Sequence, residues 1–107
     1  DDALNVFWFG GNNALTVHFR EWRSAAYYVM HTWGTSNTEY SMNYEGWLNN
    51  GHWWTVRIDY PADDFFFTFR TSDNKWEGSA AYDRRAVGEV GDIYVKPFDG
   101  KIYYTRP

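Results

Sequence analysis

His18, Trp22 and Trp76 are the residues best suited to bind a ring-shaped polar ligand, because they lie outside the apolar rows of the sequence. His18 alternates with apolar neighbours, Trp22 follows in a short polar turn, and Trp76 lies in the polar segment 73–78. An indole in water exposes a large apolar surface, so a ligand that covers it best explains a Trp in such a segment. The alternative is packing, with Trp22 as a plug across the end of the fold and Trp76 in the core.

A sugar ring has the chemistry that these three side chains would recognise. Its face of C–H bonds packs on a flat indole, and its rim of hydroxyls pairs with Asn, His, Arg and carboxylate groups. Two indoles held at an angle would select a curved glycan over a straight one. The expected polar or edge contacts of the same site are Asn74, Lys75, Glu77 and Tyr82.

Metal and catalytic chemistry have weaker support. The three histidines show no metal-binding spacing and the chain has no cysteine, so we expect no metal site and no cofactor. Glycosidases need two carboxylates about 5–10 Å apart. No pair among the acidic residues has an apolar setting that would separate the two pKa values, so we expect no catalytic residue. Acidic turns such as 63–64 favour solvated charges over a calcium site.

The composition indicates one domain over residues 1–107, with 44% hydrophobic and 22% charged residues. A net charge of −4 without a basic stripe argues against nucleic acid as a partner. The lack of a long apolar run argues against a membrane span. Aromatic residues make up 22% of the chain, more than a core of this size needs, so we expect some rings at the surface. Because the chain begins at Asp1, we expect it to be a mature or excised part of a larger protein.

Apolar and polar residues alternate with a period of two, which predicts an all-β fold. The expected core rows are Leu15, Val17 and Phe19; Trp54, Val56 and Ile58; and Phe65, Phe67 and Phe69. Turn residues between the segments predict an antiparallel β-sandwich of about seven or eight strands in two sheets. The candidate segments for these strands are 4–9, 15–20, 24–32, 53–59, 65–70, 92–96 and 101–105, with a weaker pattern at 39–44 and a short one at 80–82; an Asp99–Gly100 hairpin joins 92–96 to 101–105.

Segments 17–19, 51–58, 65–69 and 73–78, with Tyr82–Asp83 after the last, share motifs with a known group of modules. They resemble the starch-binding modules of carbohydrate-binding module families 25 and 53. The resemblance implies an immunoglobulin-like sandwich whose sugar platform consists of His18, Trp22 and Trp76. It also implies an extracellular, monomeric module attached to a carbohydrate-active enzyme.

The sequence thus predicts a non-catalytic carbohydrate-binding module that binds an α-glucan such as starch or maltooligosaccharides. One alternative is a module for β-1,3-glucan or another polysaccharide. Another is a protein-interaction sandwich with aromatic hot spots, which would lie within a wider apolar surface. Four further aromatic residues either form a second site or pack in the interior: Trp33, Tyr44, Trp47 and Trp53.

Overall fold

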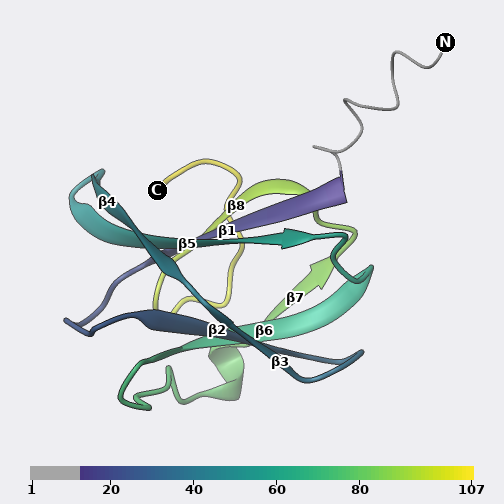
Figure 1. Cartoon of the computed structure of the whole chain (residues 1–107), viewed down its shortest axis with the longest axis horizontal. Helices are drawn as coiled ribbons and strands as arrows, with labels where there is room; N and C mark the ends of the chain where they lie inside the picture. Colours follow the sequence, from purple (N-terminus) through teal and green to yellow (C-terminus); the bar gives the residue numbers. More distant parts are fainter. Residues whose placement is uncertain (1–12) are drawn as a thin grey trace, which may run out of the picture.

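The computed structural model describes residues 13–107, which form two four-stranded sheets packed face to face (Figure 1). The elements are β1 (Ala14–Arg20), β2 (Tyr28–Trp33), β3 (Thr38–Ser41), β4 (Asn43–Leu48), β5 (Gly51–Asp59), β6 (Asp64–Thr71), the 3-10 helix η2 (Ala80–Tyr82), β7 (Arg84–Val87) and β8 (Gly91–Val95). The β1 sheet has the strand order β4-β5-β1-β8, and the β2 sheet has the order β3-β2-β6-β7. The predicted β-sandwich is confirmed, whereas the strand expected at 4–9 lies outside the described residues.

The core lies between the two sheets and contains the three predicted apolar rows. In the β1 sheet, Val17 pairs with Val56 and Phe19 pairs with Trp54, so both rows point the same way. All nine residues of the rows are buried, and the Phe19 ring stacks on Phe69 of the other sheet with centroids 3.8 Å apart. The alternate side chains of each strand point to the opposite, outward face of its sheet, where they are free to form a binding surface.

The segment expected to form one strand at 39–44 forms two strands in different sheets. β3 pairs with β2, and β4 pairs with β5. The chain crosses between the sheets at Met42, whose buried side chain joins the core and whose N–H donates to the carbonyl of Tyr28. The expected strand at 24–32 also begins later, at Tyr28.

Two predictions for the C-terminal third are wrong. Segment 80–82 is a 3-10 turn that begins at Ser79, whose hydroxyl accepts from the Ala81 N–H. Segment 101–105 forms an isolated bridge between Tyr103 and Tyr94 in place of a strand, and the Asp99 side chain accepts hydrogen bonds from the Lys101 N–H and the Tyr103 hydroxyl. The sheets are antiparallel as predicted, apart from β8, which runs parallel to β1.

Within residues 13–107, no helix has the length and apolar character needed to cross a membrane.

Candidate functional site

The outward face of the β2 sheet carries a row of aromatic side chains. On β2, Met30 is part of the buried core, so the alternating residues His31 and Trp33 point outward. Phe66 points outward from β6 for the same reason, and it is the register partner of Trp33. Trp76 follows β6 and reaches this face through a backbone bridge to Arg70. We call Phe66, Trp33, His31 and Trp76 the aromatic strip.

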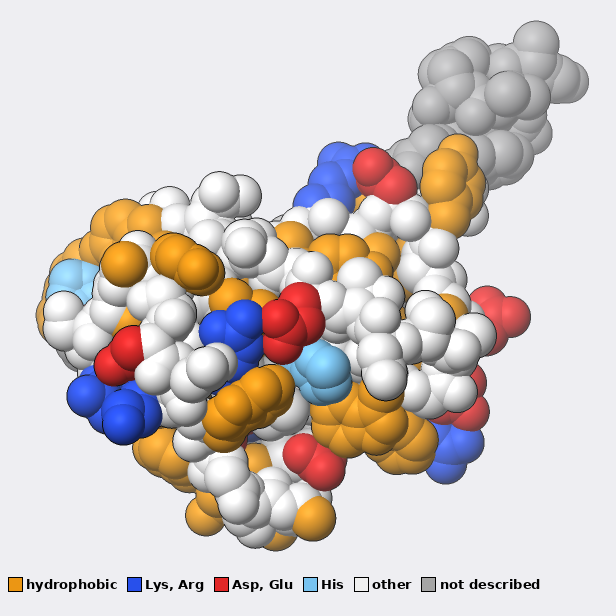
Figure 2. All heavy atoms as spheres, turned by 60° about the horizontal axis from the view of Figure 1, so that its bottom comes forward, with side chains coloured by type: hydrophobic (Ala, Val, Ile, Leu, Met, Phe, Trp, Pro, Cys, Tyr) orange, Lys and Arg blue, Asp and Glu red, His pale blue; other side chains and the backbone are white. Residues whose placement is uncertain are grey.

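The four rings of the aromatic strip are in sequential contact. The ring centroids of Phe66 and Trp33 are 5.8 Å apart with planes inclined by 20°, and those of Trp33 and His31 are 5.7 Å apart at 29°. Trp76 meets His31 edge-on, at 5.5 Å and 82°. Phe66 is 36% exposed and Trp76 is 42% exposed. On the face shown in Figure 2, one histidine near the centre lies between two groups of hydrophobic side chains, beside a basic and an acidic side chain.

Ion pairs border the aromatic strip at both ends. The Arg70 guanidinium lies 5.8 Å from the Trp76 ring and donates to Glu39, with Nη2 to Oε1 at 2.8 Å. The Arg85 guanidinium lies 5.7 Å from the Phe66 ring and pairs with Asp64 at 2.7 Å. These hydrogen bonds hold the pKa of both carboxyls, Glu39 and Asp64, below the ordinary values. The strip therefore has ionised donors and acceptors along its edge.

His31 is the polar member of the aromatic strip. Its Nδ1 is buried and lies 3.3 Å from Glu39 Oε2, but the geometry does not make a hydrogen bond. Its Nε2 has no hydrogen-bond partner within residues 13–107. A ligand hydroxyl placed over the strip therefore meets an imidazole nitrogen that is available to donate or accept.

A tight turn after β6 positions Trp76. The Asn74 N–H donates to the Thr71 carbonyl, and the Lys75 N–H donates to the Thr71 hydroxyl at 3.0 Å. Asn74 has a φ of 64°, a left-handed conformation that Asn tolerates well. Asn74 and Lys75 are exposed in this turn, next to Trp76 in sequence.

Glu77 does not lie at the surface. Its carboxylate is fully buried and forms a two-pronged ion pair with Arg84, with Nη2 to Oε2 at 2.7 Å. It also accepts from the Thr68 hydroxyl and from the Phe98 N–H. Because the hydrogen bonds of this carboxylate are made within the fold, Glu77 anchors the turn that carries Trp76 rather than offering an oxygen to a ligand.

His18 lies on the outward face of the other sheet and is 7% exposed. Its Nδ1 is 2.8 Å from Glu45 Oε1, its Nε2 is 2.9 Å from Asp92 Oδ1, and its ring stacks on Tyr94 at 4.5 Å. The fold thus uses both nitrogens that a sugar would need.

Arg106 completes the surroundings of His18. It donates to Glu45 at 2.8 Å, and its guanidinium lies 4.7 Å from the Trp53 ring and 4.9 Å from the Tyr94 ring. Burial alone would raise the pKa of Glu45, but hydrogen bonds from Arg106 and His18 hold that pKa below its ordinary value. His18 and its neighbours therefore form a closed network.

Trp22 packs at one end of the sandwich. Its ring meets Phe19 and Tyr28 edge-on, at 5.9 and 5.2 Å, and lies 5.3 Å from Phe98. The Tyr28 hydroxyl accepts from the Trp22 and Arg23 backbone N–H groups, which fixes the turn. Trp22 is half-buried against the core, the arrangement of a plug. Tyr82 meets Phe98 edge-on, at 5.7 Å.

The structure does not bring His18, Trp22 and Trp76 together. His18 and Trp76 lie on the outward faces of opposite sheets, and packed sheets are about 10 Å apart. One sugar ring cannot bridge that separation. Of the three residues, Trp76 belongs to the aromatic strip. The sequence analysis missed His31 and Phe66 as site residues and left Trp33 undecided, although all three occupy outward positions of their alternating segments.

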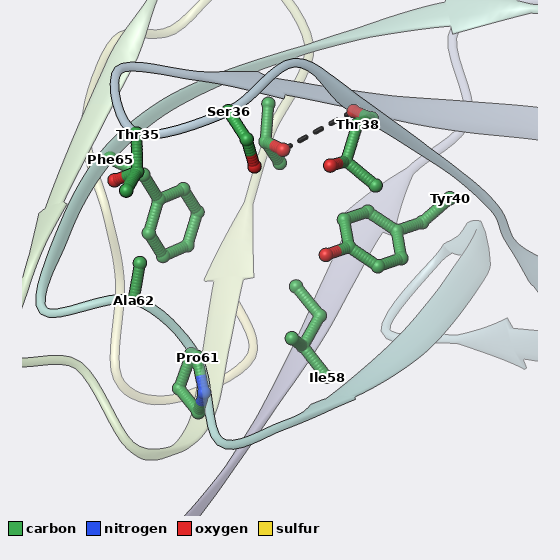
Figure 3. Close-up of a pocket in the computed structure, with 9 residues that line it drawn as sticks. Thr35, Ser36, Thr38, Tyr40, Ile58, Pro61, Ala62 and Phe65 are labelled. Atoms are coloured by element: carbon green, nitrogen blue, oxygen red, sulfur yellow. Dashed lines mark hydrogen bonds between the residues drawn. The ribbon is translucent and has the colours of Figure 1, made fainter.

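A small pocket lies at the end of the sandwich near the β2–β3 turn (Figure 3). Its volume is about 50 Å³. A water molecule occupies about 30 Å³ in the liquid, so the pocket is too small for a sugar ring. Its polar lining residues are Thr32, Thr35, Ser36, Thr38 and Tyr40. This pocket is therefore not a candidate sugar site.

No cluster of three or more His, Asp or Glu side chains within residues 13–107 could hold a metal ion. Compared with known proteins, the chain matches no family model and no curated protein sequence. The resemblance to carbohydrate-binding module families 25 and 53 therefore rests on its short motifs and remains a prediction.

Proposed function

We propose that this protein is a non-catalytic carbohydrate-binding module that holds a polysaccharide on the aromatic strip. Trp76, His31, Trp33 and Phe66 stack on the sugar rings, while Arg70, Glu39 and the exposed Asn74 and Lys75 pair with hydroxyls. No cofactor takes part. The observation that carries the proposal is the continuous row of ring contacts on the outward face of one sheet, with an ion pair at each end.

Stacking on such a strip gives modest affinity at each ring. An aromatic pair contributes about 0.5–1.5 kcal/mol beyond the burial of its surface. A site with a few stacked rings then binds with a Kd in the range of about micromolar to millimolar. Such affinity suits an extracellular module that keeps an attached enzyme near a polymer, where the effective concentration is high.

An α-glucan is the preferred ligand. The motif resemblance implies starch, and the steep angle between Trp76 and His31 gives the strip a bend that suits a curved chain. The ring planes of Phe66, Trp33 and His31 are closer to parallel and would suit a straighter glycan such as a β-linked glucan. A direct comparison of binding to an α-glucan and to a β-linked glucan decides between these ligands.

Affinity electrophoresis against a panel of soluble starch, laminarin and a soluble β-1,4-glucan tests the proposal. The wild-type protein is expected to be retarded by starch, and Trp76→Ala is expected to lose most of the retardation. Tyr60→Asn is the matched control, because Tyr60 is an exposed aromatic residue outside the strip and Asn tolerates its φ of 52°.

Each other outcome has a definite meaning. Retardation by laminarin alone overturns the α-glucan assignment and leaves the carbohydrate-binding class. Equal loss in Trp76→Ala and Tyr60→Asn overturns the aromatic strip as the site. A wild-type protein that none of the polysaccharides retards overturns the proposal and favours a protein partner.

A further inference from the structure

A second group of exposed rings lies on the hairpin formed by β4 and β5. Trp47 is 60% exposed and Tyr44 is 52% exposed. The hairpin turns at Asn49 and Asn50, which both have positive φ, of 49° and 63°, as a type I′ turn requires. This tight turn fixes the register in which Trp47 faces His52. We call Tyr44, Trp47 and His52 the hairpin cluster.

The rings of the hairpin cluster hold one another at defined angles. Trp47 meets His52 at 4.8 Å and 71°, and Tyr44 lies 5.8 Å from His52 at 45°. The Tyr44 hydroxyl is 2.7 Å from His52 Nδ1. Tyr44 also packs edge-on against Trp54 of the core, at 5.3 Å. The cluster is therefore a braced surface rather than a set of independent side chains.

A carboxylate adjoins the hairpin cluster. The Glu21 N–H donates to the His52 carbonyl, and Glu21 Oε1 accepts from Trp54 Nε1 at 2.9 Å. The second oxygen, Glu21 Oε2, has no hydrogen-bond partner within residues 13–107, and the same holds for His52 Nε2. Exposed rings next to a free carboxylate oxygen and a free imidazole nitrogen are the groups that a sugar ring requires.

The hairpin cluster is separate from the aromatic strip. Tyr44 pairs with Trp54, whose side chain lies on the inward side of the β1 sheet, whereas the strip lies on the outward side of the β2 sheet. In Figure 2, one histidine near the centre and another at the left edge each border hydrophobic side chains. Two separated aromatic surfaces are thus available to one polymer.

We propose that the hairpin cluster is a second sugar-binding site, so that the module contacts a polysaccharide at two places. Trp47 and Tyr44 stack on a glucose unit, and Glu21 and His52 pair with its hydroxyls. This inference rests on the proposed function. When a polymer binds at one site, its next units are held near the other site at a high effective concentration, so the overall affinity exceeds that of either site alone. A short oligosaccharide binds each site independently.

Titration calorimetry with maltopentaose and a binding assay on granular starch test the inference together. The variants are Trp47→Ala, Trp76→Ala, the double variant, and Tyr60→Asn as the control. The wild-type protein and Tyr60→Asn are expected to bind two maltopentaose molecules, and each single variant one. On granular starch, each single variant is expected to lose at least about tenfold in affinity because it loses the second attachment.

The outcomes separate this inference from the proposed function. A stoichiometry of one in the wild-type protein, with Trp47→Ala unchanged on granular starch and Trp76→Ala impaired, overturns the second site and leaves the proposed function intact. A wild-type protein that binds neither probe overturns both assignments for α-glucans. Thermal unfolding of each variant checks that it is folded, and the exposed position of Trp47 predicts an unchanged midpoint.

Discussion

The outward faces of the two sheets contain the same kinds of residue and use them differently. On the β1 sheet, the rings of Trp53 and Tyr94 are covered by Arg106, and both nitrogens of His18 contact carboxylates. On the β2 sheet, Phe66 and Trp76 of the aromatic strip are exposed, Trp33 and His31 are half-buried, and His31 Nε2 has no partner within residues 13–107. We call these the covered face and the open face.

The difference between the faces shows that residue type alone does not define a binding surface. A His beside Trp, Arg and Glu occurs on both faces. On the covered face, the C-terminal segment brings Arg106 onto the sheet, and Asn49 helps to hold it by donating to the Arg106 carbonyl. On the open face, the arginines lie beside the end rings, Trp76 and Phe66, which stay exposed.

The largest expected effect is the loss of stability in Trp53→Ala on the covered face. Trp53 is fully buried and its indole N–H donates to the Leu48 carbonyl at 2.8 Å. Removing a buried Trp side chain costs about 3–5 kcal/mol in the free energy of unfolding, which urea denaturation measures. Trp47→Ala, an exposed Trp on the same hairpin, is the control and should change stability by less than about 0.5 kcal/mol. Equal losses in the two variants would contradict the division into buried and exposed rings.

The next effect is the acid sensitivity of the covered face. Because the pKa of Glu45 is lower in the folded protein than in the unfolded chain, its contribution is full above the ordinary pKa of 4.5 and is lost as the pH falls through the folded value. Glu45→Gln is expected to lower the free energy of unfolding at pH 7 by about 1–2 kcal/mol. The difference from the wild-type protein should shrink toward pH 3. A difference that stays constant with pH would show that the Glu45 charge is not the cause.

A smaller effect is expected for Phe66→Ala on the open face. The loss of one stacking ring should weaken binding of the retarding glucan by about two- to tenfold, since one aromatic contact contributes about 0.5–1.5 kcal/mol. Phe66→Tyr keeps the ring and should retain the wild-type affinity. Calorimetry measures both variants. Undiminished binding by Phe66→Ala would confine the site to the Trp76 end of the aromatic strip.

The smallest effect is expected for the ion pair at the edge of the open face. Arg85 and Asp64 are both about half exposed, so their pair contributes less than about 1 kcal/mol and is screened by salt. Arg85→Gln is expected to leave the thermal midpoint nearly unchanged at 0.15 M salt. A large destabilisation would mean that Arg85 packs on Phe66 more than it pairs with Asp64.

Local patterns in the sequence predict the sandwich and its core well. The alternating row of Phe65, Phe67 and Phe69 has one possible apolar face, and the structure buries all three side chains. Arg84 shows the limit of this reasoning. It is a charged residue that points into the fold, so residues 84–87 do not show the apolar alternation by which a strand is predicted. Its buried partner Glu77 lies in a polar segment of the sequence and therefore resembles a surface acid.

The candidate site was harder to predict because it depends on pairing between distant segments. Trp33 and Phe66 are neighbours only through the register of β2 and β6. His18 was correctly placed on the polar face of its strand, but the residues that enclose it, Glu45, Asp92 and Arg106, come from distant parts of the chain. The alternation of apolar and polar residues predicts on which face of the sheet a side chain lies. It does not predict which residues from other segments will cover that side chain.

The most direct test of the open face as the sugar-binding surface is a two-dimensional ¹H–¹⁵N spectrum of the Trp indole groups during titration with maltopentaose. Trp→Phe variants assign the signals. The indole signals of Trp33 and Trp76 are expected to move with the sugar concentration, while that of Trp53, which is hydrogen-bonded to Leu48 on the covered face, stays in place. Movement of the Trp53 signal with Trp33 and Trp76 unmoved would contradict the assignment of the site to the open face.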